Sequence, residues 1–461
     1  MPPAQRVRLA GRGRHAGDGG AAAAGAAIQH TSGVHDYPGE NISYTASGDA
    51  ITADGTDTRN NPQINIGNSD TQSIAINAGG GIFSLKSGHI TLTSKEVTLI
   101  STDTSGSYSA LWAQNNSTDS NGIPVDERAS ITINAENTNI KAANSAIVAM
   151  SNGIIEINGN LYVEAQNALL ARGDAIISLN KSGESTVGID GNINFNYDGP
   201  TSGTGVNATI DITLNGADSY WNGNTLISWN GTPSDPSKLE VSEMTLTVKD
   251  GATWTPTAIQ NTTDQKYASL NNLILDNGNI DVNKGVEIAI DKVTGSGFLA
   301  NEGTVTLTSG ALEGRTENAG IINLDPGASI SNVTIEQGDA NPSAALIAVE
   351  ADRTTLNGGM ATGENATASV AGVAVDTNKN VMITSVDFKN NTFTADRNYP
   401  IIGAVTANLD AEQSLTITGS TFANNTVALT GTGSSGGSGG AAVSVKGQGE
   451  NSQLTILDST F

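Results

Sequence analysis

The residues that most often carry metal or nucleophilic chemistry are scarce in this chain. It has no cysteine, and its four histidines, His15, His30, His35 and His89, all lie in the first fifth of the 461 residues. Without cysteine there is no thiolate metal site and no cysteine nucleophile, and a Ser-His-Asp triad cannot form within the later repeats. We interpret His89, which follows Gly88 at the start of a strand, as an exposed turn residue. The sequence therefore predicts no metal site and no cofactor.

Paired carboxylates are the other source of chemistry, because glycoside hydrolysis needs two of them ~5–10 Å apart on one face. Asp49 with Asp54, and Asp54 with Asp57, have suitable sequence spacing, but each lies in a turn rich in Gly and Thr. Asp forms such turns without any catalytic role. A lyase would also need basic residues beside acidic ligands, and the later arginines stand isolated: Arg128, Arg172, Arg315, Arg353 and Arg397. We therefore predict no catalytic residue and no enzyme, with a polysaccharide hydrolase or lyase as the alternative.

Aromatic residues make up only 4% of the chain and are concentrated around Tyr220, Trp221, Trp229 and Trp254. On an exposed face these rings would form a platform on which a sugar could stack. In the interior they would fill space where the shape of the chain changes. We favour the interior interpretation and keep Tyr220, Trp221 and Trp229 as candidate ligand-stacking residues.

The elements that would position these residues repeat along the chain. Val381–Phe388 is matched by Leu415–Phe422 and again by Leu454–Phe461, so the offset is 34 for the first repetition and 39 for the second. Self-similarity of this kind predicts stacked repeats rather than a conventional globular core. We expect Phe388 and Phe422 to stack inward, with Asn391 and Asn425 paired in the adjoining turn.

A shorter spacing occurs nearer the N-terminus. Ile140–Asn144 matches Val163–Asn167 at an offset of 23, and Ile154–Ile157 matches Ile176–Leu179 at 22. This is the length of one coil of a parallel β-helix, in which equivalent residues lie about 4.8 Å above one another. The spacing predicts an all-β chain of this class, with Asn144 and Asn167 in a ladder of hydrogen-bonded amides.

Composition shifts suggest the domain organisation. Residues 1–35, with several arginines before a run of Ala and Gly, are interpreted as a leader that is disordered or an imperfect export signal. Residues 36–461 are predicted to form one solenoid with three subregions. These are 36–214 with coils at the shorter spacing, 215–341 with the Trp-containing units, and 342–461 with the Phe-x-x-Asn repeats.

The charge of the chain narrows the choice of partners. Its 46 acidic and 22 basic residues give a formal net charge of −24, with a pI near 4.3. A chain of this charge repels phosphate backbones and anionic lipid surfaces. We therefore predict no binding to nucleic acid and no direct binding to a membrane surface.

Two sets of motifs carry a family resemblance. The strand-turn units that end at Trp221 and Trp254, with the run Leu270–Leu275 after the second, resemble passenger segments of bacterial autotransporters, the type V secretion class. The C-terminal repeats are similar to those of polymorphic outer-membrane proteins. Their elements are the Gly-Gly-Ala-Ala-Val run at 439–443 and the Phe-x-x-Asn pairs at 388–391 and 422–425.

The resemblance implies a passenger domain folded as a right-handed parallel β-helix, with the pectin lyase-like fold. Such a passenger is exported through the outer membrane and is displayed on the bacterial cell surface or secreted. Its implied role is that of a virulence-related adhesin that binds host-cell, matrix or glycan ligands, and a purely structural stalk is a further alternative. Because Phe461 ends the chain in mid-motif, we expect a truncated β-helix whose contact with the membrane is made by a missing C-terminal β-barrel.

Overall fold

The computed structural model describes most of the chain between Ile28 and Phe461. The described residues are 28–55, 61–105, 108–115, 128–197, 208–229, 243–259, 265–318, 321–324, 328–336, 347–349, 354–362, 366–367, 375–377, 381–384, 387–389, 392–396, 405–409, 411–424, 426–430, 442–447 and 449–461. Strands account for 69% of the structure and there is no helix among these residues. It follows that this part of the chain contains no apolar helix of the length needed to cross a membrane.

The chain divides into two compact units. The first consists of residues 1–246 and 260–268, and the second of residues 247–259 and 269–461. The predicted subregion limits at 214 and 341 do not coincide with this division and stay predictions. Residues 1–27 of the predicted leader lie outside the described residues, and its remaining part already contains strand residues.

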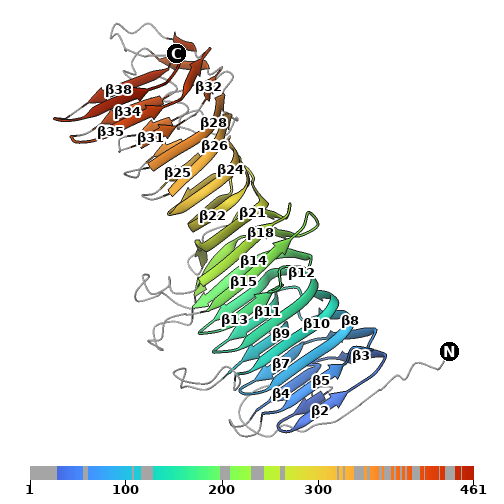
Figure 1. Ribbon diagram of the computed structural model, residues 1–461. Coiled ribbons are helices and arrows are strands. Elements are labelled where there is room, and N and C mark those ends of the chain that lie inside the picture. The colour runs from blue at the N-terminus through green and yellow to red at the C-terminus, as the bar shows by residue number, and fades with distance from the viewer. Residues whose placement is uncertain are drawn as a thin grey trace. The chain divides into compact units, whose positions relative to one another are not determined.

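The first unit is built from short and long strands, most of them paired in parallel with one another (Figure 1). They are β1 (Ile28–His30), β2 (Val34–Tyr37), β3 (Asn41–Ala46), β4 (Ile51–Asp54), β5 (Gln63–Gly67), β6 (Ser73–Ala78), β7 (Ile82–Leu85), β8 (His89–Ser101), β9 (Ser109–Gln114), β10 (Ser130–Lys141), β11 (Ser145–Met150), β12 (Ile154–Arg172), β13 (Ile176–Leu179), β14 (Val187–Tyr197), β15 (Thr209–Asn215), β16 (Tyr220–Asn222), β17 (Thr225–Trp229) and β20 (Gln265–Tyr267). Strand β18 (Glu243–Lys249) contains the boundary between the units.

The second unit repeats the same kind of element. Its strands are β19 (Thr253–Thr255), β21 (Leu270–Val282), β22 (Glu287–Asn301), β23 (Thr304–Leu307), β24 (Gly310–Asn318), β25 (Ile321–Leu324), β26 (Ala328–Glu336), β27 (Ile347–Val349), β28 (Thr354–Thr362), β29 (Ala366–Thr367), β30 (Val375–Thr377), β31 (Val381–Thr384), β32 (Asp387–Lys389), β33 (Thr392–Asp396), β34 (Val405–Leu409), β35 (Ser414–Thr418), β36 (Thr421–Ala423), β37 (Thr426–Thr430), β38 (Val443–Gly447) and β39 (Gln453–Leu457).

Each strand buries alternate side chains. In β8, Ile90, Leu92, Val97 and Leu99 are no more than 1% exposed, whereas the threonines between them point outward. This alternation follows from the period of two in a pleated strand, and β-branched residues suit such a surface. The core is therefore a narrow column of Ile, Leu and Val, as expected for a chain with few aromatic residues.

The shorter predicted spacing is confirmed in the first unit. Ile154 is the register partner of Ile176 in the parallel pair of β12 with β13. Ile140 is the partner of Val163 in the parallel pair of β10 with β12. Residues that the sequence placed above one another are thus hydrogen-bonded neighbours.

The predicted amide ladder of Asn144 and Asn167 is wrong. The backbone N–H of Asn167 does bond the carbonyl of Asn144 at 2.7 Å, but the register partner of Asn167 is Ser145. The Asn144 Nδ2 is buried without a hydrogen-bond partner. The register partner of Ile140 is Val163, whereas that of Ser145 is Asn167, so the corner between these positions shortens the spacing by one residue and displaces Asn144.

The longer predicted spacings are confirmed in the second unit. Phe388 is the partner of Phe422 in the pair of β32 with β36, and Leu415 is the partner of Leu454 in the pair of β35 with β39. The Phe422 ring is 4% exposed and stacks on Phe461, with ring centroids 5.0 Å apart. The side chain of Phe388, and all of Asn391 and Asn425, lie outside the described residues.

The predicted fold class is corrected by the closure of the sheet. Followed through its hydrogen-bonded strands, the main sheet is a closed eight-stranded parallel β-barrel with further strands outside it, so the prediction of a right-handed parallel β-helix is wrong. The physical reason is that some strands are long enough to turn a corner. The 19-residue β12 pairs with both β13 and β14, and the 13-residue β8 pairs with both β5 and β6. Such strands join successive parts of one continuous sheet.

The corner within β12 requires glycine. Gly159 has a φ of +94°, and a Cβ at this position would lie 1.7 Å from the carbonyl oxygen of Ala135. The register with β10 shifts at the same place, between Asn134 and Asn137. A glycine with a register irregularity lets a strand bend without breaking the sheet.

Candidate binding face

Four neighbouring strands of the first unit carry an ordered set of polar and aromatic side chains on their outer surface. The strands are β10, β12, β14 and β16, and they pair in parallel in that order. One outward column runs through Lys141, Glu164, Asp190 and Asn222, and the next through Tyr162, Gly188 and Tyr220. We call these seven residues the tyrosine–carboxylate face.

A third column of residues lies between these two outward columns. Its side chains point inward and fix the position of the other two. Val163, Ile189 and Trp221 are register partners on successive strands, and each is 0% exposed. Because their neighbours on either side must then point outward, the burial of this column sets the direction of both tyrosines and both carboxylates.

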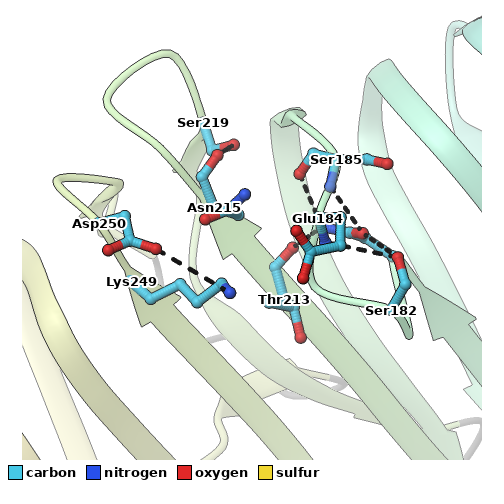
Figure 2. Close-up of polar contacts among 9 residues, drawn as sticks. Ser182, Glu184, Ser185, Thr213, Asn215, Ser219, Lys249 and Asp250 are labelled. Atoms are coloured by element: carbon cyan, nitrogen blue, oxygen red, sulfur yellow. Dashed lines mark hydrogen bonds and ion pairs between the residues drawn. The ribbon is translucent and has the colours of Figure 1, made fainter.

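The turn that leads into β14 is held by Asn180. This residue is 1% exposed and has a φ of +53°, which Asn tolerates better than most residues. Its Nδ2 donates to the carbonyls of Ser185 at 2.7 Å and Thr213 at 3.0 Å, and its Oδ1 accepts from the N–H of Ser185 at 3.1 Å. Figure 2 shows this turn around Ser182 and Ser185, together with Thr213 of β15. Asn180 thus closes its own turn and links that turn to β15.

A serine links β14 to the turn before β16. The Ser219 hydroxyl donates to the carbonyl of Asn215 at 2.5 Å, and both residues are labelled in Figure 2. The same hydroxyl accepts the N–H of Val187 at 2.9 Å. Val187 begins β14 and Tyr220 begins β16. The contact therefore aligns the starts of these two strands, where the tyrosine–carboxylate face begins.

Asp190 is the centre of the hydrogen bonds on the face. Its Oδ2 accepts from the phenol of Tyr220 at 3.0 Å and from that of Tyr162 at 3.2 Å. Its Oδ1 accepts from the Nδ2 of Asn222 at 2.8 Å. The Tyr162 hydroxyl also lies 3.1 Å from the Oε2 of Glu164, so one phenol serves both carboxylates.

Lys141 borders the face on its first strand. Its Nζ lies 2.8 Å from the Oε2 of Glu164 and 5.4 Å from the ring centre of Tyr162. Both charged side chains are about half exposed, so solvent screens their attraction and the pair adds little to stability. It orients the Glu164 carboxylate toward the ring.

Gly188 gives the two tyrosines room to converge. A Cβ at this position would lie 3.1 Å from the Cε1 of Tyr220 and 3.3 Å from the Cδ2 of Tyr162. Any side chain here would therefore push the rings apart. The glycine in this column thus leaves a space on the strand between the two tyrosines, and both rings extend toward it.

The hydrogen bonds and burial fix the protonation of the face. Burial, with a hydrogen bond to Asp190, raises the pKa of Tyr220 to about 12. Burial and hydrogen bonds to both carboxylates raise the pKa of Tyr162 as well. Hydrogen bonds from Lys141 and Tyr162 lower the pKa of Glu164. At neutral pH the phenols are therefore donors and the carboxylate of Glu164 is an ionised acceptor.

The structure separates the three candidate stacking residues. Tyr220 lies on the tyrosine–carboxylate face, whereas Trp221 is 0% exposed and its Nε1 donates to the carbonyl of Gly191 at 2.9 Å. Trp221 therefore fills the core, as does Trp254 of the second unit at 1% exposure. The side chain of Trp229 lies outside the described residues.

Sequence reasoning missed Tyr162, the partner of Tyr220. A lone Tyr in a strand rich in Leu, Val and Ala carries no signal by itself. The signal that could have found it is the register: Tyr162 pairs with Gly188, which pairs with Tyr220. To predict this register from the sequence, one would need to know how many residues each of the two corners between these strands contains.

The structure describes two of the three carboxylates that the sequence paired, and it also describes His89. The Asp54 Oδ1 lies 3.1 Å from the Nζ of Lys86, and burial raises the pKa of Asp49, while Asp57 lies outside the described residues. His89 is not an exposed turn residue, because it begins β8 and its Nδ1 lies 2.7 Å from the Oγ of Ser130.

Three of the five arginines that the sequence singled out lie in the described part of the chain. Arg315 lies 5.4 Å from the ring centre of Phe298, and Arg353 and Arg397 are outside the described residues. No group of three or more His, Asp or Glu side chains in the described segments could hold a metal ion.

Comparison with known proteins finds no match for this chain among protein families, curated proteins or solved structures. The resemblance to autotransporter passengers therefore depends on the sequence motifs alone.

Proposed function

We propose that this protein is a non-catalytic, adhesin-like binding protein, displayed on or shed from a bacterial cell surface, that contacts glycans on host cells or matrix. The observation that carries the proposal is the tyrosine–carboxylate face. Two tyrosine rings extend toward Gly188 from either side on an outer sheet surface, beside two carboxylates that accept hydrogen bonds. Rings of this kind pack against the apolar faces of sugars, and carboxylates accept hydrogen bonds from their hydroxyl groups.

The export class is part of the proposal. It is supported by the likeness of the Trp221 and Trp254 units to autotransporter passengers, and by a chain without cysteine, which has no disulfide to obstruct passage in an unfolded state. The protein would be found at the outer membrane or in the medium. Antibodies raised against the chain should label intact cells of the producing bacterium, and label confined to permeabilised cells would contradict surface display.

Glycan binding is tested with a double variant, Tyr162→Ala with Tyr220→Ala. Removing both rings should weaken binding to an arrayed glycan at least tenfold, because each aromatic contact contributes about 1 kcal/mol or more and about 1.4 kcal/mol is tenfold. The matched control is Tyr108→Ala, which removes a tyrosine that is 41% exposed elsewhere in the first unit. Equal binding by the double variant and the control would contradict a role for the face.

One observation favours an enzyme instead. Glu164 and Asp190 both lie within hydrogen-bond distance of the same phenol oxygen, so two carboxylates are close together. A glycosidase, however, needs one of its two carboxyl groups to be protonated as the general acid, whereas both carboxylates here accept hydrogen bonds, which favours their ionised forms. We therefore expect no new reducing ends or unsaturated products when the protein is incubated with soluble polysaccharides, and their release would overturn the binding assignment.

A further inference from the structure

The phenol donors of the tyrosine–carboxylate face are already occupied. The phenol protons of Tyr162 and Tyr220 are directed at carboxylates, and the Asn222 amide donates to Asp190. The phenols and carboxylates can therefore offer a ligand only oxygen lone pairs, and the donors that are left are one N–H of Asn222 and the further N–H groups of Lys141. A face that offers acceptors selects a ligand that offers donors.

The charges of the face are also unbalanced. Lys141 pairs with Glu164, whereas Asp190 accepts hydrogen bonds only from neutral groups among the described residues. The face therefore carries two carboxylates and one ammonium group, within a chain whose formal charge is −24. Asp190 is the carboxylate that a cationic ligand would neutralise, and an acidic sugar would be repelled.

The tyrosine rings suit the same ligand. Aromatic faces attract cations, and the Lys141 ammonium already lies 5.4 Å from the Tyr162 ring centre. Carboxylate, phenol and ring face together form the kind of site that binds a protonated amine on an otherwise neutral, hydroxyl-rich molecule.

We propose that the ligands of this face are amino-sugar glycans with free amino groups, and that Asp190 receives the ammonium. This inference rests on the proposed function, because it names the class of glycan bound at the same face. It distinguishes an unsubstituted amino sugar from its N-acetylated form, which has the same hydroxyl groups and no positive charge.

The test compares a glucosamine tetramer with its N-acetylated counterpart, using the full chain and calorimetric or surface binding. We expect the free amine to bind at least tenfold more tightly, and this preference to shrink as salt rises from about 50 to 500 mM because ions screen the attraction. Equal affinity for both tetramers would overturn the inference while leaving the proposed function intact. Binding of neither tetramer would overturn the inference, and the glycan array then decides the proposed function separately.

Three variants distinguish general charge attraction from binding at the site. Asp190→Asn should reduce affinity for the free amine at least tenfold, whereas Asp36→Asn on β2, with the same loss of charge, should change it less than twofold. Glu164→Gln serves as a second variant, because this exposed side chain can change without loss of the fold, and it should weaken binding severalfold. Equal losses in all three variants would assign the binding to bulk charge and overturn the inference.

Discussion

Gly188 decides whether Tyr162 and Tyr220 act as one surface or as two separate rings. Its missing Cβ is the space into which both rings extend, at 3.1 and 3.3 Å from where that atom would be. Asp190, two residues later on the same strand, holds both hydroxyl groups. The candidate site thus depends on Gly188 and Asp190, two successive outward positions of β14, more than on either tyrosine alone.

Replacing Gly188 should weaken glycan binding while leaving the thermal stability of the protein almost unchanged. In Gly188→Val the branched side chain suits a strand, so we expect the thermal unfolding temperature to change by no more than about 4 °C. The rings would be forced apart, and glycan binding should fall at least tenfold. Ala75→Val, at an exposed position of β6 in the same outward column, is the matched control and should bind normally. Normal binding by Gly188→Val would show that the rings need not meet.

A pair of histidines makes strands β1 and β2 sensitive to acid. The rings of His30 and His35 stack with centroids 3.4 Å apart, and burial, followed by the charge of His35, lowers the pKa of His30. The folded state therefore favours neutral His30. Its stabilising contribution is present above the unfolded pKa of about 6.5 and is lost as pH falls below that value.

The measurement is amide hydrogen exchange of β1 and β2 at pH 7.5 and 5.5, corrected for intrinsic rates. We expect opening of these strands to become easier at the lower pH. His30→Phe keeps an aromatic ring against His35 and removes the titrating group, so its pH dependence should be smaller. An unchanged pH dependence in this variant would exclude His30 as its source.

The strands show how far sequence spacing can predict a fold. Both the shorter and the longer repeat spacings were confirmed because side-chain burial alternates along each strand and fixes which residues stack. Sheet closure was missed because it depends on long strands such as β12 continuing around a corner at Gly159. The predicted pairing of Asn144 with Asn167 was wrong for a related reason. One residue more or less in a corner changes the pairing of the strands without changing the hydrophobic pattern.

The corner at Asn180 is the element that most directly supports the face. Asn180→Ala would leave the carbonyls of Ser185 and Thr213 without their amide donor and would place alanine at a φ of +53°. We expect a loss of about 2–4 kcal/mol in the opening free energy of the β14 amides, measured by hydrogen exchange. Asn180→Gly tolerates the same φ and should recover about 1 kcal/mol of it. A loss below about 0.5 kcal/mol in the alanine variant would show that the corner does not depend on these bonds.

At the scale of the whole molecule, charge and the division into two units shape what the protein can bind. A net charge of −24 disfavours nucleic acid and acidic glycans throughout the chain, whereas the tyrosine–carboxylate face belongs to the first unit alone. Glycan binding should therefore stabilise the first unit by ~2.7 kcal/mol at a ligand concentration one hundred times Kd. No such gain is expected in the second unit.

The most direct test of the central claim is amide hydrogen exchange of the full chain with and without a saturating glucosamine tetramer, read by mass spectrometry. We expect the added protection to be concentrated in peptides that contain Tyr162, Asp190 and Tyr220. Saturable binding that leaves these peptides unprotected, or that protects the second unit instead, would contradict the account.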